Sequence, residues 1–259
     1  MTAETKPDGL VGGSAPARRR ALILPAILTA IGIVALMGLG FWQLERLIWK
    51  SALIALIETR IHASPGRIVA EPEWPRWKAA DDEYRRVRLE GTFLHDKEAL
   101  VHANAPRDAR GNVINGYFVL TPLRLAEGGI VIVNRGFVPP ELADRTKRAG
   151  SQPQGEVAVT GLARASQQRG WFVPKDDPAM GQWYSRDVPA IAAAAGLTRV
   201  APFIVDADAD PAQPWPKGGL TVVRFPNNHF EYALTWFGLA ATLVGVFAVF
   251  AWRTLWPSS

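Results

Sequence analysis

The chain has 259 residues, of which ten are tryptophan and none is cysteine, and a formal net charge of +5. The lack of cysteine excludes disulfides, thiolate catalysis and Cys-x-x-Cys metal or covalent haem sites. The two terminal segments carry five basic and two acidic side chains, so the charge predicts membrane topology and gives no reason to expect a nucleic-acid partner.

Two segments without charge are long enough to cross a membrane. They are Ala21–Trp42, with 22 residues, and Tyr232–Trp252, with 21 residues. A helix rises about 1.5 Å per residue, so each segment can span a hydrocarbon core roughly 30 Å thick. The first segment follows a basic cluster, as a cleaved signal peptide does. Its length and the sequence "GLGFWQLER" at its end favour an uncleaved anchor instead.

The residues that flank the two spans predict their orientation. Lys6 and Arg18–Arg20 precede the first span, and Arg253 follows the second. Because cationic flanks remain in the cytoplasm, we expect residues 1–20 to be a disordered cytoplasmic segment and residues 253–259 a cytoplasmic tail. Acidic residues near the start argue against a mitochondrial presequence. We therefore expect a multi-pass protein of the bacterial inner membrane, with residues 43–231 in the periplasm.

The helical pattern continues beyond the first span. Apolar residues in "QLERLIWKSALIALIETRIH" recur at helical spacing, which predicts a stalk that ends before Pro65 and Gly66. The stalk would either pack on the following domain or take part in recognition.

From Tyr84 onward, apolar residues recur at every second position, as they do in a β-strand. "RRVRLEGTF" predicts a strand, and "YFVLTPLRLAEGGIVIVNRGFVP" predicts a hairpin that turns at Glu127–Gly129 around a buried strand. Asn134–Gly136 are expected to form the turn that ends this strand, although a functional surface is the alternative. "GEVAVTGLAR" and "GLTVVRF" predict further strands, the last leading almost directly into the second span.

"RDVPAIAAAAGL" predicts a short helix with Asp187 as its N-cap and Gly196 as its C-cap, and "DPAQPWPKGG" predicts a loop. The fold class that follows is a membrane protein in which two transmembrane helices flank a mostly-β, α+β domain.

No catalytic motif is present. The sequence lacks a phosphate-binding loop, a nucleophile elbow and a zinc-protease motif. His62, His95 and His102 fall in predicted loops or at strand edges, and we expect them to be surface residues with a poor spacing for a metal. A membrane-anchored hydrolase is therefore the least supported hypothesis, and we expect a protein that is not an enzyme.

His229 differs from the other histidines in its position at the start of the second span. If the helix begins near Pro226, which suits a first-turn position, His229 lies at the outer rim of the bilayer. Tyr232, Ala233 and Trp236 then lie on or beside the same helical face. Such a face can hold a flat hydrophobic macrocycle, with His229 as the axial metal ligand and Tyr232 and Trp236 beside it.

Two further points about His229 stay open. Glu231 or Asn228 is expected to orient the imidazole through its second nitrogen. The alternative is a histidine that hydrogen bonds to lipid headgroups or to the periplasmic domain.

The segment "LGFWQLERLIWK" resembles the start of the Surfeit locus protein 1 family, whose Trp-Gln-x-x-Arg-x-x-x-Lys pattern falls on Trp42, Gln43, Arg46 and Lys50. The pieces "GTFLHDKEALV", "GYFVLTPLRL", "GGIVIVNRGFVP" and "PNNHFEYALTWF" follow in family order. The family often has Leu-Gln where this chain has Phe230–Glu231, which leaves the histidine in place but changes the local charge.

The resemblance implies an assembly factor for haem–copper terminal oxidases, such as aa3-type cytochrome c oxidase. Such a factor binds haem a as a transient cargo and aids its insertion into the catalytic subunit. The resemblance also implies that His229 is the haem ligand and that oxidase subunit I and haem a synthase are partners. The alternative function is a membrane-anchored scaffold that stabilises subunit I without binding haem.

Overall fold

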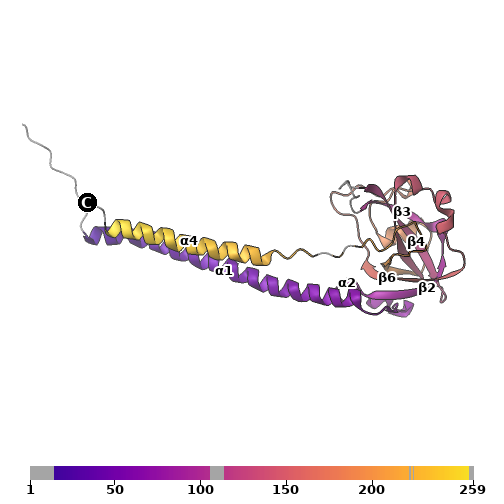
Figure 1. The fold of residues 1–259 in the computed structure, drawn as a ribbon, viewed down its shortest axis with the longest axis horizontal. Coiled ribbons are helices and arrows are strands. Elements are labelled where there is room, and N and C mark those ends of the chain that lie inside the picture. The colour runs from indigo at the N-terminus through magenta and orange to yellow at the C-terminus, as the bar shows by residue number, and fades with distance from the viewer. Residues whose placement is uncertain (1–14, 106–113, 222, 224, 257–259) are drawn as a thin grey trace, which may run out of the picture. The chain divides into compact units, whose positions relative to one another are not determined.

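The computed structural model describes residues 15–105, 114–221, 223 and 225–256, and the chain divides into two compact units (Figure 1). The first unit contains Met1–Ala55 and Phe225–Ser259, and we call it the helix pair. The second unit is Leu56–Arg224, which we call the β domain.

The helix pair consists of most of α1 (Ala15–His62) and all of α4 (His229–Leu255). Both helices are long and apolar enough to cross a membrane by length and composition. They contain the two predicted spans. Residues 15–20, which we expected to belong to a disordered segment, form the first turns of α1. The remaining terminal residues, 1–14 and 257–259, lie outside the described residues.

The ends of the two helices partly match the sequence prediction. α1 continues as one helix through the predicted stalk and stops at His62, before Pro65 and Gly66. The predicted start of α4 near Pro226 is wrong, because the helix begins at His229. Asn228 is its N-cap, and the carbonyl of Asn228 accepts from the Tyr232 amide at 3.2 Å.

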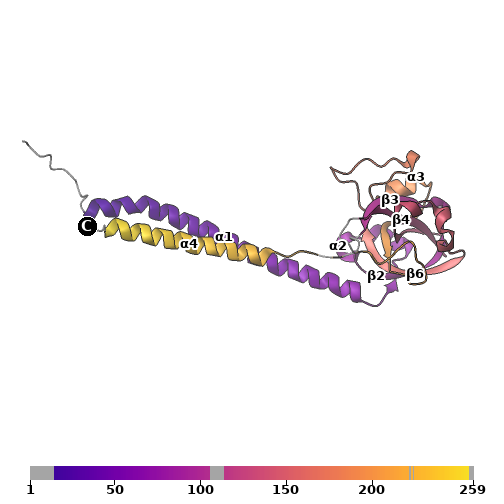
Figure 2. The same ribbon diagram turned by 45° about the horizontal axis from the view of Figure 1, so that its top comes forward.

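α1 and α4 lie side by side and antiparallel (Figure 2). The rings of Phe41 and Phe237 meet edge to face, with centroids 5.5 Å apart. Gly40 is buried beside them, and a Cβ atom added to it would come within 2.4 Å of the Phe237 ring. Small residues allow helix backbones to approach closely in a membrane, where helices associate mainly through packing. The absence of a side chain at Gly40 therefore allows this contact.

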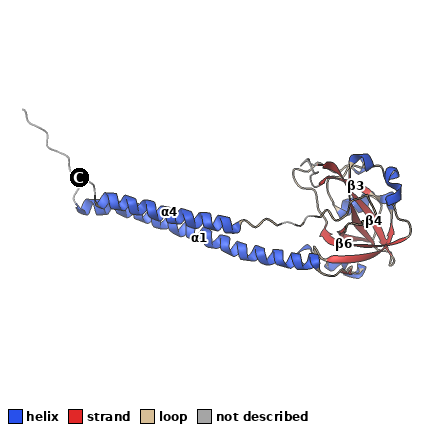
Figure 3. Ribbon diagram, viewed as in Figure 1, coloured by secondary structure: helices blue, strands red, loops and turns tan. Residues whose placement is uncertain are grey.

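The β domain is built on a seven-stranded sheet that closes on itself (Figure 3). Five strands pair in a ring, in the order β2 (Arg86–Phe93), β6 (Glu156–Ala165), β7 (Val200–Ala207), β5 (Ile130–Val138) and β4 (Ile114–Leu125), and β4 pairs back to β2. β1 (Gly66–Arg67) adds to β2, and β3 (Ala99–Ala105) adds to β4. At the closing contact, a Cβ atom on Gly91 would lie 2.3 Å from the Arg124 carbonyl oxygen, so the closure requires glycine there.

The short helices lie between these strands. They are α2 (Ala79–Asp82), α3 (Val188–Ala194) and the 3₁₀ turns Glu71–Arg76, His95–Lys97, Pro140–Leu142, Arg145–Ser151 and Pro178–Met180.

Two apolar clusters form the core of the β domain, and β5 contributes to both. Val131 and Val133 pack in a cluster with Phe203 and Trp74, and Ile132 packs in the cluster that contains residues of α3. Every residue of β5 is buried, so the prediction of a strand covered on both faces is confirmed.

Several local predictions are confirmed. β2 and β6 occupy the predicted segments, and β4 and β5 form the predicted hairpin. Gly128 in its turn has φ +89°. α3 begins after Asp187, whose carboxylate accepts from the Ala190 amide at 3.4 Å, and Gly196 beyond its end has φ +64°.

Two predictions at the end of the β domain are wrong. Residues 219–221, 223 and 225 form no strand, although "GLTVVRF" alternates as a strand does. Within the described residues the last strand is β7, which the sequence analysis does not predict, and 21 residues separate its end from α4. The Thr221 hydroxyl donates to the Asp206 carboxylate at 2.8 Å, so Thr221 is held by a side-chain contact, and the described residues of the segment enter no strand ladder.

Asn134–Gly136 are not a strand-ending turn. They lie inside β5, at a β-bulge where one residue of β4, Val119, faces two residues of β5, Arg135 and Gly136. Gly136 has φ +122°, a conformation that side chains disfavour, and this lets the strand continue through the bulge. The Asn134 amide donates to the Asp206 carboxylate at 2.9 Å, so Asn134 stabilises the interior of the domain and does not form a functional surface.

Candidate ligand site at the start of α4

His229 is the first residue of α4, and its ring is tied to the neighbouring helix. Nδ1 lies 2.7 Å from Oε1 of Gln43 on α1. Gln43 is buried, with 9% of its surface exposed, whereas His229 is partly exposed. Within the described residues, Nε2 of His229 makes no hydrogen bond.

Gln43 replaces the orienting residues that the sequence suggested. Glu231 is exposed, and Asn228 is the N-cap of the helix. Neither side chain holds the imidazole, so that prediction is wrong. Gln43 and His229 are 186 residues apart, and no local pattern connects two residues at that separation. The only sequence signal for Gln43 was its place in the Trp-Gln-x-x-Arg pattern.

A second polar contact joins α1 to the residues just before α4. The Asn227 amide donates to the Ser51 hydroxyl at 3.1 Å. Together with the Gln43 contact, this bond ties the start of α4 to α1 at two points.

The other predicted site residues lie on two sides of α4. Ala233 is only 1% exposed and shares its helical face with Phe237, which packs on α1. The face that we expected to be open is therefore covered at Ala233. Tyr232 is 56% exposed and Trp236 is partly buried, so these two aromatic side chains form an accessible flank beside His229.

The segment of α1 that carries Gln43 is rich in aromatic and cationic side chains. The Arg46 guanidinium lies over the rings of Trp42 and Trp49, with Cζ 5.7 and 5.6 Å from their centroids. Tryptophan is enriched where a transmembrane helix meets the aqueous interface, which fits the predicted end of the first span at Trp42.

The remaining histidines lie in the β domain. His62 is exposed at the end of α1, and His102 is exposed on β3, where its ring stacks on Tyr184 at 4.6 Å. His95 is partly buried, and its Nε2 lies 3.0 Å from the Pro153 carbonyl oxygen. The part of the chain that the structure describes contains no group of three or more His, Asp or Glu side chains that could hold a metal ion.

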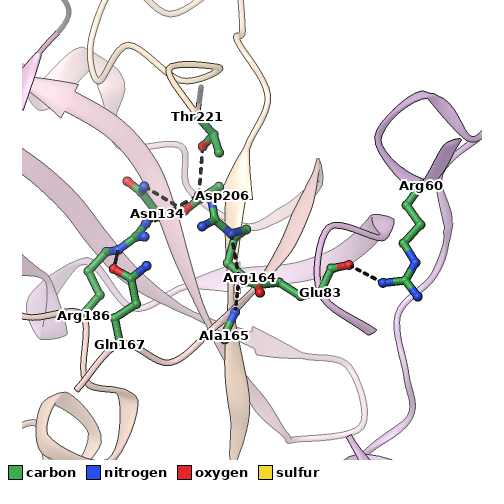
Figure 4. Close-up of polar contacts among 9 residues, drawn as sticks. All are labelled: Arg60, Glu83, Asn134, Arg164, Ala165, Gln167, Arg186, Asp206 and Thr221. Carbon is green, nitrogen blue, oxygen red and sulfur yellow. Dashed lines mark hydrogen bonds and ion pairs between the residues drawn. The ribbon is translucent and has the colours of Figure 1, made fainter. Parts of the chain in front are cut away.

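A cluster of buried charges surrounds Asp206 on β7 (Figure 4). Asp206 is 3% exposed and accepts from Arg164 at 3.3 Å and from Arg186 at 3.1 Å. Arg164 also donates to Glu83 at 3.1 Å. The two arginines and two carboxylates balance in charge, which is the condition under which buried ions are tolerated.

Arg135 is a second buried cation, beside Phe93. It is 7% exposed, and its guanidinium lies 4.9 Å from the Phe93 ring centroid and donates to the carbonyl of Ser151 and, at 3.1 Å, to Gln213. Burial lowers the pKa of Arg135 to about 10, so the side chain is still protonated at neutral pH. These contacts favour a structural role for Arg135.

His229 is the one residue of this candidate site that could hold a haem iron, through a single ring nitrogen. Nε2 has no competing hydrogen bond within the described residues, and one neutral imidazole is a common haem ligand. Tyr232 and Trp236 offer aromatic surface on the accessible side. Nε2 of His229 is a single metal ligand at an accessible surface. One such ligand favours reversible binding of a metal-containing group.

Comparison with known proteins identifies the family. A model described as the SURF1 family matches residues 30–241, a range that contains both Gln43 and His229. The chain belongs to the SURF1 family. Surfeit locus protein 1 of Rattus norvegicus is 37% identical to it over 229 residues, which cover 84% of this chain and 72% of the relative.

Two other relatives show a similar level of identity. Surfeit locus protein 1 of Homo sapiens is 36% identical over 220 residues, covering 80% of this chain and 71% of the relative. The SURF1-like protein of Monosiga brevicollis is 36% identical over 219 residues, covering 80% of each chain. The likeness to the SURF1 family therefore extends over both the β domain and the paired helices.

Proposed function

We propose that this SURF1-family chain is an assembly factor for haem–copper terminal oxidases of the aa3 cytochrome c type. It holds haem a through His229 and aids its insertion into oxidase subunit I. The observation that carries the proposal is the His229 ring, fixed at Nδ1 by Gln43 and free of hydrogen bonds at Nε2 within the described residues.

In this proposal the protein binds haem a and releases it to the oxidase, and it catalyses no reaction. Haem a would supply an iron centre, to which an imidazole nitrogen can bind, and a flat apolar ring. His229 provides that nitrogen, and Tyr232 and Trp236 flank it with aromatic surface. One axial ligand at an accessible surface gives a reversible affinity, whereas two ligands in an enclosed pocket would retain the cargo. This arrangement suits a carrier that must hand its cargo to another protein.

The proposed location is the bacterial inner membrane, with both termini in the cytoplasm and the β domain in the periplasm. The two apolar helices support membrane anchoring, and the cationic flanks of the spans support the orientation. The relatives described above are eukaryotic, so the bacterial membrane is inferred from the sequence alone. We expect the β domain to contact oxidase subunit I and haem a synthase.

An assembly assay in cells tests this function. A strain that lacks the protein is complemented with the wild type, with His229→Ala, or with His62→Ala as a control histidine outside the site. The haem a band of the oxidase and the amount of subunit I are measured together. The wild type and His62→Ala should restore the haem a band, and His229→Ala should restore several-fold less.

The same assay distinguishes the alternatives. Full restoration by His229→Ala would contradict the haem role and favour a scaffold that stabilises subunit I without haem. A normal oxidase in the strain without the protein would contradict any role in oxidase assembly.

A further inference from the structure

We propose that Gln43 is a positioning residue that fixes the tautomer of His229, so that the lone pair of Nε2 is available to a haem iron. The tautomer claim concerns the protein without ligand, and only its consequence for haem rests on the proposed function. The geometry behind it is the 2.7 Å contact between Oε1 of Gln43 and Nδ1 of His229.

The chemistry of the two groups determines the direction of the hydrogen bond. The amide oxygen of a glutamine only accepts, so the proton of the bond lies on Nδ1. A neutral imidazole carries one proton, and Nε2 therefore keeps its lone pair. A hydrogen bond of ordinary strength changes a two-state ratio by about tenfold, which is enough to determine the dominant tautomer.

The packing of α1 on α4 holds Gln43 in place for this contact. Gly40 lies one helical turn before Gln43, and its close approach to Phe237 fixes the spacing of the two helices there. On the other side, the bond from Asn227 to Ser51 ties the residues before α4 to α1. The buried Gln43 side chain thus lies between two helix contacts and does not depend on a mobile loop.

The neutral amide also sets how strongly His229 binds metal. A carboxylate that accepts from a ligating histidine raises the basicity of that ligand. An amide polarises the ring less, so the metal bond is weaker. Gln43 therefore combines a fixed ring orientation with a moderate bond strength, which suits a cargo that must be released.

The first test measures the tautomer without haem. The full chain, with 15N-labelled histidine, is placed in lipid nanodiscs, and the chemical shifts of the His229 ring nitrogens are recorded. The wild type should show the proton on Nδ1. Gln43→Leu should raise the ratio of the Nε2-protonated form to the Nδ1-protonated form by about tenfold.

Two controls separate this effect from loss of structure. Asn227→Ala removes the neighbouring interhelical bond but leaves Gln43 in place, so the His229 shifts should stay as in the wild type. The chain has no cysteine, so a Ser51→Cys, Asn227→Cys pair can report helix pairing by cross-linking in the Gln43→Leu background. Wild-type protein with the proton on Nε2, or Gln43→Leu with unchanged shifts and intact cross-linking, would overturn the proposal.

The second test measures haem release to apomyoglobin from protein loaded with haem a. Gln43→Leu should release haem about tenfold faster than the wild type, and Gln43→Glu should release it more slowly and lower the reduction potential of the bound iron. Equal release rates in all three proteins would overturn the role of Gln43 in ligation. Failure of the wild type to bind haem would instead contradict the proposed function, while the tautomer measurement would still decide the role of Gln43.

Discussion

Replacing Asp206 with asparagine tests the buried charge cluster of the β domain. Asp206 is 3% exposed, and the side chains of its partners Arg164 and Arg186 are 12% and 13% exposed. Asparagine keeps the size but removes the charge and turns one acceptor into a donor that faces arginine. Removal of one partner from a buried ion group costs about 3–5 kcal/mol.

This cost predicts a measurable loss of thermal stability. For a domain of this size, 1 kcal/mol corresponds to about 2–4 °C in Tm, so Asp206→Asn should lower the Tm of the β domain by about 6–20 °C. The assay is near-UV circular dichroism of the full chain on heating. Asp208→Asn is a matched control on the same segment, because the Asp208–Arg86 pair is about one third exposed and should contribute about 1 kcal/mol or less. Equal Tm values for the wild type and Asp206→Asn would refute the reasoning.

Three further predictions concern single residues. Gly136→Ala should destabilise the β domain by at least about 2 kcal/mol in chemical denaturation, because φ is +122° and the new Cβ would lie 2.0 Å from the Lys217 carbonyl oxygen; an unchanged midpoint would contradict the bulge. Gly40→Ala should reduce cross-linking between cysteines placed at Ser51 and Asn227, because its Cβ would overlap the Phe237 ring; undiminished cross-linking would contradict the packing. The hydrogen bond from Arg199 lowers the pKa of the Glu71 carboxyl group in the folded protein. The stability that this ion pair contributes is therefore present above the pKa that Glu71 has in the unfolded chain, and it is lost as the pH falls through the lower pKa of the folded protein. Glu71→Gln should therefore lower Tm at neutral pH and flatten the fall in Tm below about pH 4.5, the ordinary pKa of the carboxyl group; identical pH profiles would contradict this linkage.

Elements with a strong local signal could be predicted from the sequence. β2 alternates apolar and polar residues, and the hairpin turns where Glu127–Gly129 supply glycines. α3 has a capping aspartate before it and a glycine after it. In each of these cases the physical cause lies within a few residues of the element.

Elements that depend on distant partners were missed or misplaced. In β7 the four successive residues Phe203–Asp206 are all buried, and Pro202 interrupts the apolar run before them, so no period of two marks the segment as a strand. "GLTVVRF" has a strand-like pattern, but the Thr221 side chain is held by Asp206 and the described residues of the segment enter no ladder. Propensity is a weak guide when tertiary contacts determine the conformation.

The same distinction applies to the candidate site. The position of His229 before an apolar helix and its place in a family pattern were visible in the sequence. The contact with Gln43 was not, because it requires α1 and α4 to pack antiparallel with a defined register. That register depends on the fit of Gly40 against Phe237, which no composition or period reveals.

The most direct test of the account is the haem content of the purified protein. Wild type and His229→Ala are produced in cells that make haem a, and the Soret absorbance is measured per mole of protein, with membrane insertion confirmed for both. The account predicts a Soret band in the wild type that falls several-fold in His229→Ala. A wild type without the band, or a variant that retains all of it, would contradict the claim that His229 holds the haem.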